Sequence, residues 1–436
     1  MQPEIKVGIV SAEKLDLSFN TPYWSEETGF FVSGKQTFGI SDSGKIVWND
    51  TEYATLIFKS DLVGCNFEVS DVTIGINFHW ERKETQTFTG NARIIVENSK
   101  LTLINELPVE DYLKSVISSE MSASANEEFL KTHAVISRSW VLAQIFKRDA
   151  NGKTESSHVT DDEIVRWYDR EDHLNFDVCA DDHCQRYQGI TRQTSPTVSA
   201  AIDATAGLVL TDDKGDICDA RFSKCCGGVF EEFENCWEPV HHNYLVARRD
   251  SDEPLDFPDL RNEQNAREWI LSSPEAYCNT DDKAILSQVL NNYDQETSDF
   301  YRWRVHYSQA ELAHLIKRRT GIDFGGIKSL EALERGTSGR IIRLRITGTK
   351  RTMTIGKELE IRRSLSQSHL YSSAFVVETG EPDEQGLPTD FTLIGAGWGH
   401  GVGLCQIGAA VMSAKGISYD KILAHYFPGS KLSKAY

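Results

Sequence analysis

The sequence predicts an α+β protein, with a β-rich N-terminal region followed by a mixed α/β region and an interdomain cleft. Residues 5–105 contain short runs of alternating apolar and polar side chains, separated by turn-forming Gly, Asn, Asp and Ser. This pattern is typical of a small antiparallel sandwich or barrel. After residue 106, helical periodicity alternates with further short strands. Two motif-rich segments, 107–140 and 397–409, lie far apart in this second region, and we expect them to meet across the cleft.

A chain of 436 residues is long enough for two or three domains. We expect a β-rich domain at 1–105, a second region at 106–436, and a surface insertion at about 250–300, where the sequence is charged and irregular. Helical periodicity and capping signals predict helices at about 109–120, 308–320, 406–415 and 419–426.

The net charge of −19 argues against nucleic acids and anionic membranes as partners, because both require a basic surface. No apolar run is long enough to span a bilayer. The first residues lead directly into a predicted strand, without the apolar stretch of a secretory signal. We therefore expect either a cytoplasmic protein or one whose leader has been removed.

Glu120 is the first candidate for chemistry. Val109, Tyr112, Val116 and their apolar neighbours recur at helical spacing, so Glu120 falls at the C-terminal end of an amphipathic helix. The negative end of the helix dipole and apolar surroundings both raise the pKa of such a carboxyl group. A general acid that works near neutral pH needs a raised pKa. The alternative is a solvated glutamate at the end of a helix.

A second candidate site lies in residues 173–184, where two histidines and two cysteines occur within twelve residues. Imidazole and thiolate groups suit Zn²⁺, although the spacing is not that of a standard zinc finger. A pair of buried thiols or a local disulfide explains the pattern equally well. The vicinal Cys225 and Cys226 are open to three interpretations: a redox pair, thiols that line a site, or core residues.

The sequence GWGHGVG at 397–403 is a third candidate. Four glycines in seven residues free the backbone for positive φ and leave His400 uncrowded. Such a histidine is poorly explained as a core residue, and the spacing of phosphate-binding loops is absent.

Together these motifs resemble the stage II sporulation protein D / amidase-enhancer (SpoIID/LytB) family. The resemblance rests on segments 105–121, 130–140, 173–187, 223–228 and 397–409, and more weakly on 338–362, which occur in the family's order. The sequence departs from the family pattern at Ser122, at His133 and at Cys225-Cys226.

The resemblance implies a catalytic region at 106–436 that acts as a peptidoglycan lytic transglycosylase, or a protein that stimulates cell-wall amidases. It places the catalytic acid at Glu120 and the zinc-associated residues at His173, Cys179 and Cys184, with His183 as a candidate fourth ligand. The candidate substrate-binding residues are Arg138, Ser223, Trp398, His400 and Gln406. Zinc with three or four protein ligands would brace the loop rather than act chemically.

In the expected reaction, Glu120 protonates the glycosidic oxygen between N-acetylmuramic acid and N-acetylglucosamine. The carboxylate then takes the proton of the muramic acid C6 hydroxyl, and a 1,6-anhydro ring closes. An internal nucleophile makes the second carboxylate of ordinary glycosidases unnecessary. Two alternatives are a non-catalytic enhancer that binds glycan or an amidase, and a zinc hydrolase that uses His173, Cys179, Cys184 and His400. A peptidoglycan substrate implies the cell envelope.

Overall fold

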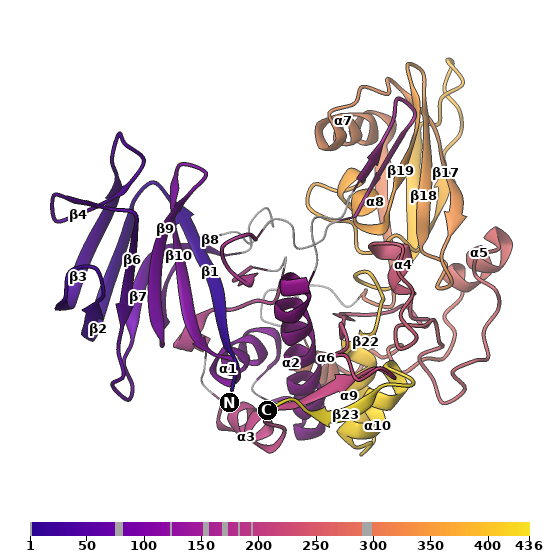
Figure 1. Cartoon of the computed structure of the whole chain (residues 1–436). Coiled ribbons are helices and arrows are strands. Elements are labelled where there is room, and N and C mark those ends of the chain that lie inside the picture. Colours follow the sequence, from indigo (N-terminus) through magenta and orange to yellow (C-terminus); the bar gives the residue numbers. More distant parts are fainter. Residues whose placement is uncertain are drawn as a thin grey trace. The chain divides into compact units, whose positions relative to one another are not determined.

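The computed structural model describes residues 2–74, 82–122, 124–150, 157–167, 173–181, 184–192, 195–289 and 299–436, without the side chains of 147–150 (Figure 1). The chain forms two compact units, which are described separately. The first comprises Met1–Asp149, Asp172–Val209 and Lys434–Tyr436, and the second comprises Ala150–Glu171 and Leu210–Ser433. Both units combine helices and strands, so the predicted α+β class is confirmed.

The first unit is built on an eleven-stranded sheet in the order β13-β1-β10-β9-β6-β2-β3-β4-β5, with β7 on β2 and β8 on β7. Its strands are β1 (Glu4–Ala12), β2 (Leu15–Ser25), β3 (Phe30–Ile40), β4 (Ile46–Trp48), β5 (Thr51–Tyr53), β6 (Thr55–Lys59), β7 (Phe67–Ile74), β8 (Arg82–Phe88), β9 (Asn91–Glu97), β10 (Lys100–Pro108) and β13 (Val178–Cys179). The β-rich N-terminal region is therefore confirmed.

This sheet branches at β2, which differs from the expected sandwich or barrel. The register of β2 shifts between Phe19 and Tyr23, so its first half pairs with β7 and its last residues pair with β6. Alternating residues of the strands bury an aromatic cluster, in which the Phe19 ring lies 4.9 Å from that of Phe58 and 6.0 Å from that of Phe67.

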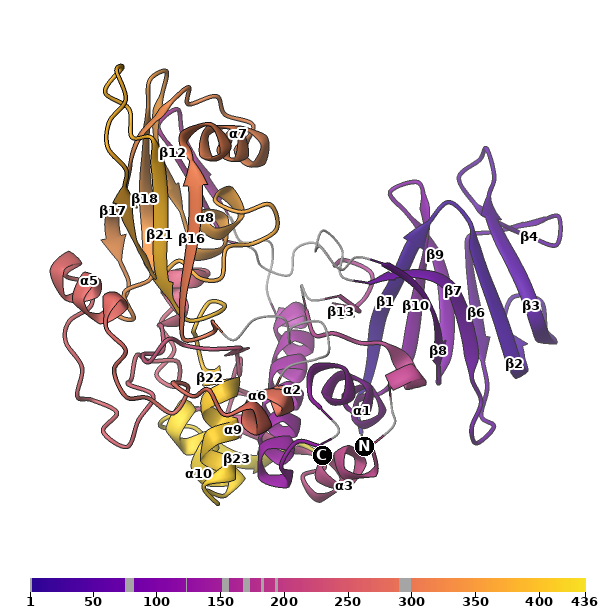
Figure 2. The ribbon, with the colours of Figure 1, turned by 180° about the vertical axis from the view of Figure 1, so that it is seen from behind.

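Three α-helices complete the described part of the first unit: α1 (Val109–Glu120), α2 (Glu127–Ala150) and α3 (Pro196–Ala204). The predicted helix at 109–120 is confirmed as α1, which buries its apolar face and ends where Met121 becomes extended. The two chain termini lie close together beside α1 and α3 (Figures 1 and 2). Backbone bonds from Val109 to Pro3 and from Ala435 to Gly207 fix both ends. The unit extends past the predicted boundary after residue 105, and that boundary stays a prediction.

The second unit contains a five-stranded sheet in the order β11-β12-β19-β18-β17 and a three-stranded sheet in the order β16-β21-β20 (Figure 2). These strands are β11 (Ser157–Val159), β12 (Glu163–Arg166), β16 (Arg302–Ser308), β17 (Ile327–Arg335), β18 (Ile341–Gly348), β19 (Thr352–Gly356), β20 (Phe375–Thr379) and β21 (Asp390–Ala396). Two short sheets pair β14 (Leu208–Thr211) with β23 (Lys431–Lys434), and β15 (Phe222–Ser223) with β22 (Leu404–Cys405).

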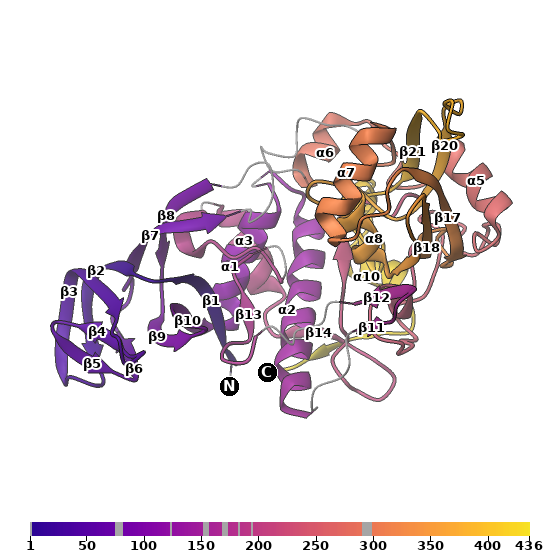
Figure 3. The ribbon, with the colours of Figure 1, turned by 90° about the horizontal axis from the view of Figure 1, so that it is seen from above.

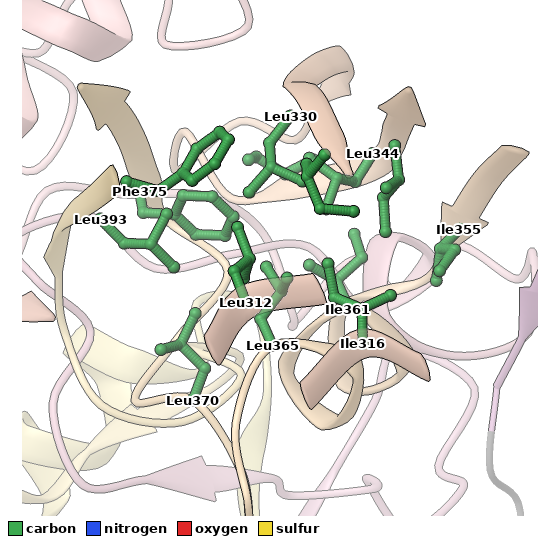
Figure 4. Close-up of a cluster of buried hydrophobic side chains, with 14 of the residues drawn as sticks. Leu312, Ile316, Leu330, Leu344, Ile355, Ile361, Leu365, Leu370, Phe375 and Leu393 are labelled. Carbon is green, nitrogen blue, oxygen red and sulfur yellow. The ribbon is translucent and has the colours of Figure 1, made fainter. Parts of the chain in front are cut away.

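The described helices of this unit are α4 (Phe233–Cys236), α5 (Glu263–Leu271), α6 (Lys283–Val289), α7 (Gln309–Thr320), α8 (Glu358–Ser364), α9 (Gln406–Ala414) and α10 (Tyr419–Tyr426). The predicted helices near 308–320, 406–415 and 419–426 are confirmed. Helix α8 lies against β18 and β19 of the larger sheet, and α7 lies against β16 and β21 of the smaller sheet and against β17 (Figure 3). Leu312 and Ile361 enter the core with Leu344 and Phe375 (Figure 4).

Part of the expected insertion at 250–300 is buried. Leu260 and Trp269 pack against Val229, and Ile270 packs against the β20–β21 strands. This segment therefore contributes to the core of the second unit, and its origin as an insertion stays a prediction.

Candidate functional site

Glu120 is the last residue of α1, and its side chain is half-buried. Its carboxylate Oε1 accepts the backbone N–H of Arg186 at 3.3 Å. This bond positions the carboxylate and stabilises its charged form, whereas the C-terminal end of the helix disfavours a negative charge. The geometry therefore holds the acid in place against the segment around Arg186.

The segment that carries Arg186 is docked along α1 by three further contacts. Gln185 accepts the hydroxyl of Tyr112 at 3.2 Å, and the N–H of Gln188 donates to the Ser115 hydroxyl at 3.1 Å. The Tyr187 ring stacks on Tyr112, with 5.3 Å between ring centroids. These buried bonds fix the backbone on either side of Arg186, so the donor that faces Glu120 is rigidly placed.

Directly before this segment lies the predicted metal site. His173, Cys179 and Cys184 each offer one ligand atom, and the three atoms lie within 4.8 Å of one another. His173 Nε2 is 3.5 Å from the Cys184 sulfur, and the N–H of Cys179 donates to that same sulfur at 3.4 Å. One imidazole and two thiols converging at this spacing fit Zn²⁺, which binds both ligand types. His183, the candidate fourth ligand, lies outside the described residues.

The loop that carries His173, Cys179 and Cys184 is anchored on β1, to which it adds the edge strand β13. Val178 and Cys179 form β13, which pairs in parallel with Val7 and Gly8. The ring of Phe176 occupies the space that a Cβ at Gly8 would need, at 2.6 Å. The loop thus depends on a glycine in β1, a relation that only the folded chain reveals.

A cavity of about 500 Å³ lies beside this loop, and His173, Cys179 and Arg186 contribute to its wall. Gln86 also lines it, and its buried side-chain amide has no hydrogen-bond partner among the described residues. The cavity provides polar groups within the first unit, next to the segment that holds Glu120.

Arg138 lies on α2, and its side chain is fully buried. Its guanidinium makes a bidentate pair with Glu110, at 3.0 and 2.6 Å, and donates to the carbonyl of Leu208 at 3.0 Å. This arrangement favours a structural role for Arg138 over the predicted contact with sugar, because the side chain is enclosed and paired with Glu110 instead of Glu120.

In the second unit, the GWGHGVG segment forms the expected glycine loop. Gly397, Gly399, Gly401 and Gly403 all have positive φ, between 72° and 94°. The loop pairs with the vicinal cysteines, because Cys225 and Trp398 exchange two backbone hydrogen bonds, at 3.1 and 2.7 Å. The predicted 223–228 and 397–403 segments are therefore adjacent.

His400 is held inside its own unit. Its Nδ1 accepts the N–H of Val402 at 3.0 Å, and its ring also hydrogen-bonds to the Phe222 backbone. Burial, with the charges of Arg221 and Arg340, lowers the pKa of His400 well below its ordinary value. A neutral ring with these partners braces the loop, which disfavours His400 as the ligand of a hydrolytic zinc.

The other predicted binding residues differ in accessibility. Trp398 is half-buried, and its ring packs against Tyr371 at 4.5 Å and Phe300 at 4.8 Å. The Ser223 hydroxyl is buried and has no hydrogen-bond partner among the described residues, whereas Gln406 is buried at the start of α9. Trp398 thus keeps the most accessible surface of the three.

The sequence did not reveal two buried charged residues that hold the glycine loop. Arg340 donates to the carbonyls of Gly399 and Cys226, at 3.1 Å each. Glu231 donates its N–H to Gly401 and accepts the hydroxyl of Ser338 at 2.6 Å. Burial raises the pKa of Glu231 above its ordinary value in spite of these hydrogen bonds. Residue type and spacing gave no signal for Glu231, while Arg340 lies inside the weaker family-like segment at 338–362.

The fold and the site define a two-unit α+β protein with an acid at a helix end beside a thiol–imidazole cluster. A Stage II sporulation protein family model matches residues 97–211, which include Glu120, His173, Cys179 and Cys184. A model of a domain of unknown function, DUF8618, matches residues 231–403. Most of the first match falls in the first unit, except for residues 150–171 and 210–211, and the second match falls in the second unit.

Curated relatives agree with the first match. Stage II sporulation protein D of Bacillus subtilis is 22% identical over 333 residues, which cover 76% of this chain and 76% of the relative. An amidase enhancer of the same organism is 23% identical over 74% of this chain and 40% of the relative. An uncharacterised protein of Brachyspira hyodysenteriae is 25% identical over 78% of this chain and 71% of the relative. The predicted resemblance to the stage II sporulation protein D and amidase-enhancer family is confirmed.

Proposed function

We propose that this protein is a lytic transglycosylase of the bacterial cell wall, with Glu120 as its general acid and base. The single observation that carries the proposal is the placement of Glu120 at the end of α1, with its carboxylate on the N–H of Arg186. Glu120 also lies inside the segment similar to the sporulation protein family. The names of the relatives support a role in the cell wall, and we place the protein in the cell envelope.

In the proposed reaction, the protonated Glu120 donates its proton to the oxygen of the bond between N-acetylmuramic acid and N-acetylglucosamine. The carboxylate then accepts the proton of the C6 hydroxyl as that oxygen bonds to C1, giving the 1,6-anhydro product. The N–H of Arg186 stabilises the carboxylate between the two proton transfers. A single acid serves both steps because the nucleophile belongs to the substrate.

His173, Cys179 and Cys184 would hold a Zn²⁺ ion, which supplies a fixed cross-link when bound. The segment after Cys184 carries the N–H that faces Glu120 and is docked on α1. We infer that the cross-link positions this backbone donor. Trp398 and Ser223 stay candidate glycan-binding residues of the second unit.

The test uses glycan strands freed of peptide, incubated with the wild type or with Glu120→Gln. Mass spectrometry should detect 1,6-anhydro ends with the wild type, and the rate should fall by about 10²–10⁴-fold in the variant, the usual contribution of general acid–base catalysis. Glu127→Gln is the matched control, because this nearby glutamate is exposed and pairs with Lys131 at the surface. Equal rates for wild type and Glu120→Gln would refute the mechanism.

An amidase-enhancer relative supports a second candidate, a non-catalytic protein that stimulates a cell-wall amidase. Adding the wild type and Glu120→Gln separately to a purified amidase distinguishes the two functions. The enhancer function predicts equal stimulation by both proteins and no anhydro ends from the wild type alone. The transglycosylase function predicts anhydro ends without any amidase.

A further inference from the structure

A second group of metal-ligating side chains lies in the second unit, apart from the predicted zinc site. Cys226, Asp250, Cys278 and Cys405 each offer one ligand atom, and the four atoms lie within 4.8 Å of one another. All four residues are buried, with at most 2% of their surface exposed. Residues that span 179 positions of the chain therefore converge on one point in the interior.

The backbone places these ligands in pairs. Strands β15 and β22 pair in parallel, with Ser223 opposite Cys405, so the loop after β15 brings Cys226 beside Cys405. The N–H of Cys226 donates to the Cys405 sulfur at 3.2 Å. The N–H of Cys278 donates to Asp250 Oδ2 at 3.0 Å, which joins the second pair.

We propose that Cys226, Asp250, Cys278 and Cys405 bind one Zn²⁺ ion in a closed, structural site. Three thiolates and one carboxylate match the ligands and the coordination number of structural zinc. The Cys226 and Cys278 sulfurs are 3.5 Å apart. Two thiolates on one tetrahedral Zn²⁺ stand about 3.8 Å apart, from Zn–S bonds of about 2.3 Å.

The spacing distinguishes this ion from two other uses of clustered cysteines. A disulfide requires a sulfur–sulfur distance of about 2.05 Å, much shorter than the 3.5 Å between Cys226 and Cys278. An iron–sulfur cluster distributes its thiolates over two or more irons bridged by sulfide, whereas the four ligand atoms here lie within 4.8 Å, around the space of one ion.

The surroundings of the four ligands resemble the outer shell of a metal site. The Tyr426 hydroxyl donates to Asp250 Oδ1 at 2.8 Å, and the N–H of Gly228 donates to the Cys226 sulfur at 3.4 Å. A Cβ at Gly408 would lie 2.6 Å from Asp250 Oδ2, so α9 approaches the carboxylate only through a glycine. Such donors orient ligands and disperse their charge.

Burial also favours a cation at this point, because it keeps water away from the four converging ligand atoms. When Zn²⁺ binds, each ligating thiol releases its proton to solvent, and the ion replaces that proton as the partner of the sulfur. The ion would then cross-link the loop after β15, the Asp250 and Cys278 segments, and the start of α9.

Metal content of the full-length chain, purified without chelator and measured by inductively coupled plasma mass spectrometry, tests the site. The Cys179→Ser/Cys184→Ser variant removes the ligands of the first unit and should retain one zinc per chain. Adding Cys226→Ser/Cys278→Ser should remove that ion. Cys218→Ser/Cys236→Ser in the same background is the control, since these buried thiols lie outside the cluster and should leave one zinc.

Cobalt provides a measurement that does not depend on the folding of the cluster variant. The Cys179→Ser/Cys184→Ser chain, exchanged with Co²⁺, should show thiolate-to-cobalt charge transfer and the visible bands of tetrahedral cobalt. No bound zinc or cobalt in this background would overturn the proposal, as would a Cys226–Cys278 disulfide in the unreduced chain or iron with inorganic sulfide. None of these readouts depends on Glu120 or on glycan cleavage.

Discussion

At the scale of single residues, the buried pair of Arg138 and Glu110 shows how polar groups organise the first unit. Glu110 accepts two bonds from Arg138, one from the N–H of Gly207 and one from the hydroxyl of Tyr436. Burial opposes its charge, but Arg138, Tyr436 and Gly207 together lower the pKa of Glu110 below its ordinary value. The Glu110 carboxylate on α1 thus connects that helix to α2, to the backbone at Gly207 and to the C-terminal residue Tyr436.

We expect Arg138→Met to destabilise the protein by about 3–5 kcal/mol at pH 7, because it leaves a buried carboxylate unpaired. The folded-state pKa of Glu110 is lowered, so the charged carboxylate contributes fully to the free energy of unfolding above its unfolded-state pKa of about 4.3. This contribution is lost as the pH falls through the folded-state pKa. Thermal unfolding of wild type and Glu110→Gln should therefore differ at pH 7, and the difference should shrink as pH falls below the ordinary carboxyl pKa toward the lowered folded-state pKa.

The matched control for this pair is Glu127→Gln, which breaks an exposed contact with Lys131 on the same helix as Arg138. An exposed pair contributes about 0–1 kcal/mol, so this variant should unfold close to the wild type. A destabilisation by Glu110→Gln that stays constant as the pH is lowered from 7 into the acid range would contradict the assigned role of the charge.

At the scale of elements, the glycine loop is shaped by close packing as much as by its turns. Gly401 has a φ of +79°, and a Cβ there would lie 2.4 Å from the guanidinium carbon of Arg340. Arg340 is buried and donates to Gly399, Cys226 and Ser338, so its side chain has little room to move. The loop therefore needs glycine at 401 for conformation and for space.

Gly401→Ala should destabilise the protein more than Gly416→Ala, as measured by denaturant unfolding. Both glycines have a φ of +79°, but nothing lies within 4 Å of a Cβ at Gly416. The shared left-handed conformation costs about 1–2 kcal/mol for alanine, and overpacking at 401 adds about 1–3 kcal/mol. Similar losses for both variants would show that Arg340 moves aside.

At the scale of the whole molecule, the chain is divided into two compact units, and most of each family match lies in a different unit. The sporulation-protein match ends at residue 211, and the first unit ends at Val209 before its return at Lys434. The described part of the chain contains no helix that is long and apolar enough to cross a membrane.

Because each unit has its own core, we expect two transitions in differential scanning calorimetry of the full-length protein. Arg138→Met should lower the midpoint of one transition and Gly401→Ala the midpoint of the other, since the two residues belong to different units. A single transition that both variants lower would contradict independent unfolding of the units.

Much of the fold could be predicted from the sequence, because its signals are local. The amphipathic patterns of α1 and α7 and the glycine after α9 each act within a few neighbouring residues. The branch of the sheet at β2 could not be predicted, because it depends on which distant strands pair with each half of β2.

The candidate site likewise contains some residues that the local sequence indicated and others that only the fold brings into place. His173, Cys179 and Cys184 lie within twelve residues; their spacing left a metal site and buried thiols equally open, and the family resemblance pointed to these three as ligands, which the structure brings together. Arg138 was predicted to bind sugar or to tune Glu120 from its place one helix after Glu120, while the fold buries it against Glu110. Glu231 lacked any local signal, since its partners come from segments about a hundred residues away.

By itself, the sequence determined the α+β class, the helix that ends at Glu120 and the glycine loop around His400. Only the tertiary structure decided that Arg186 faces Glu120, and that Cys226, Asp250, Cys278 and Cys405 meet. The physical reason is range: dihedral preferences and side-chain periodicity act over one or two turns, whereas a site of separated residues forms only when strand pairing and burial bring the segments together.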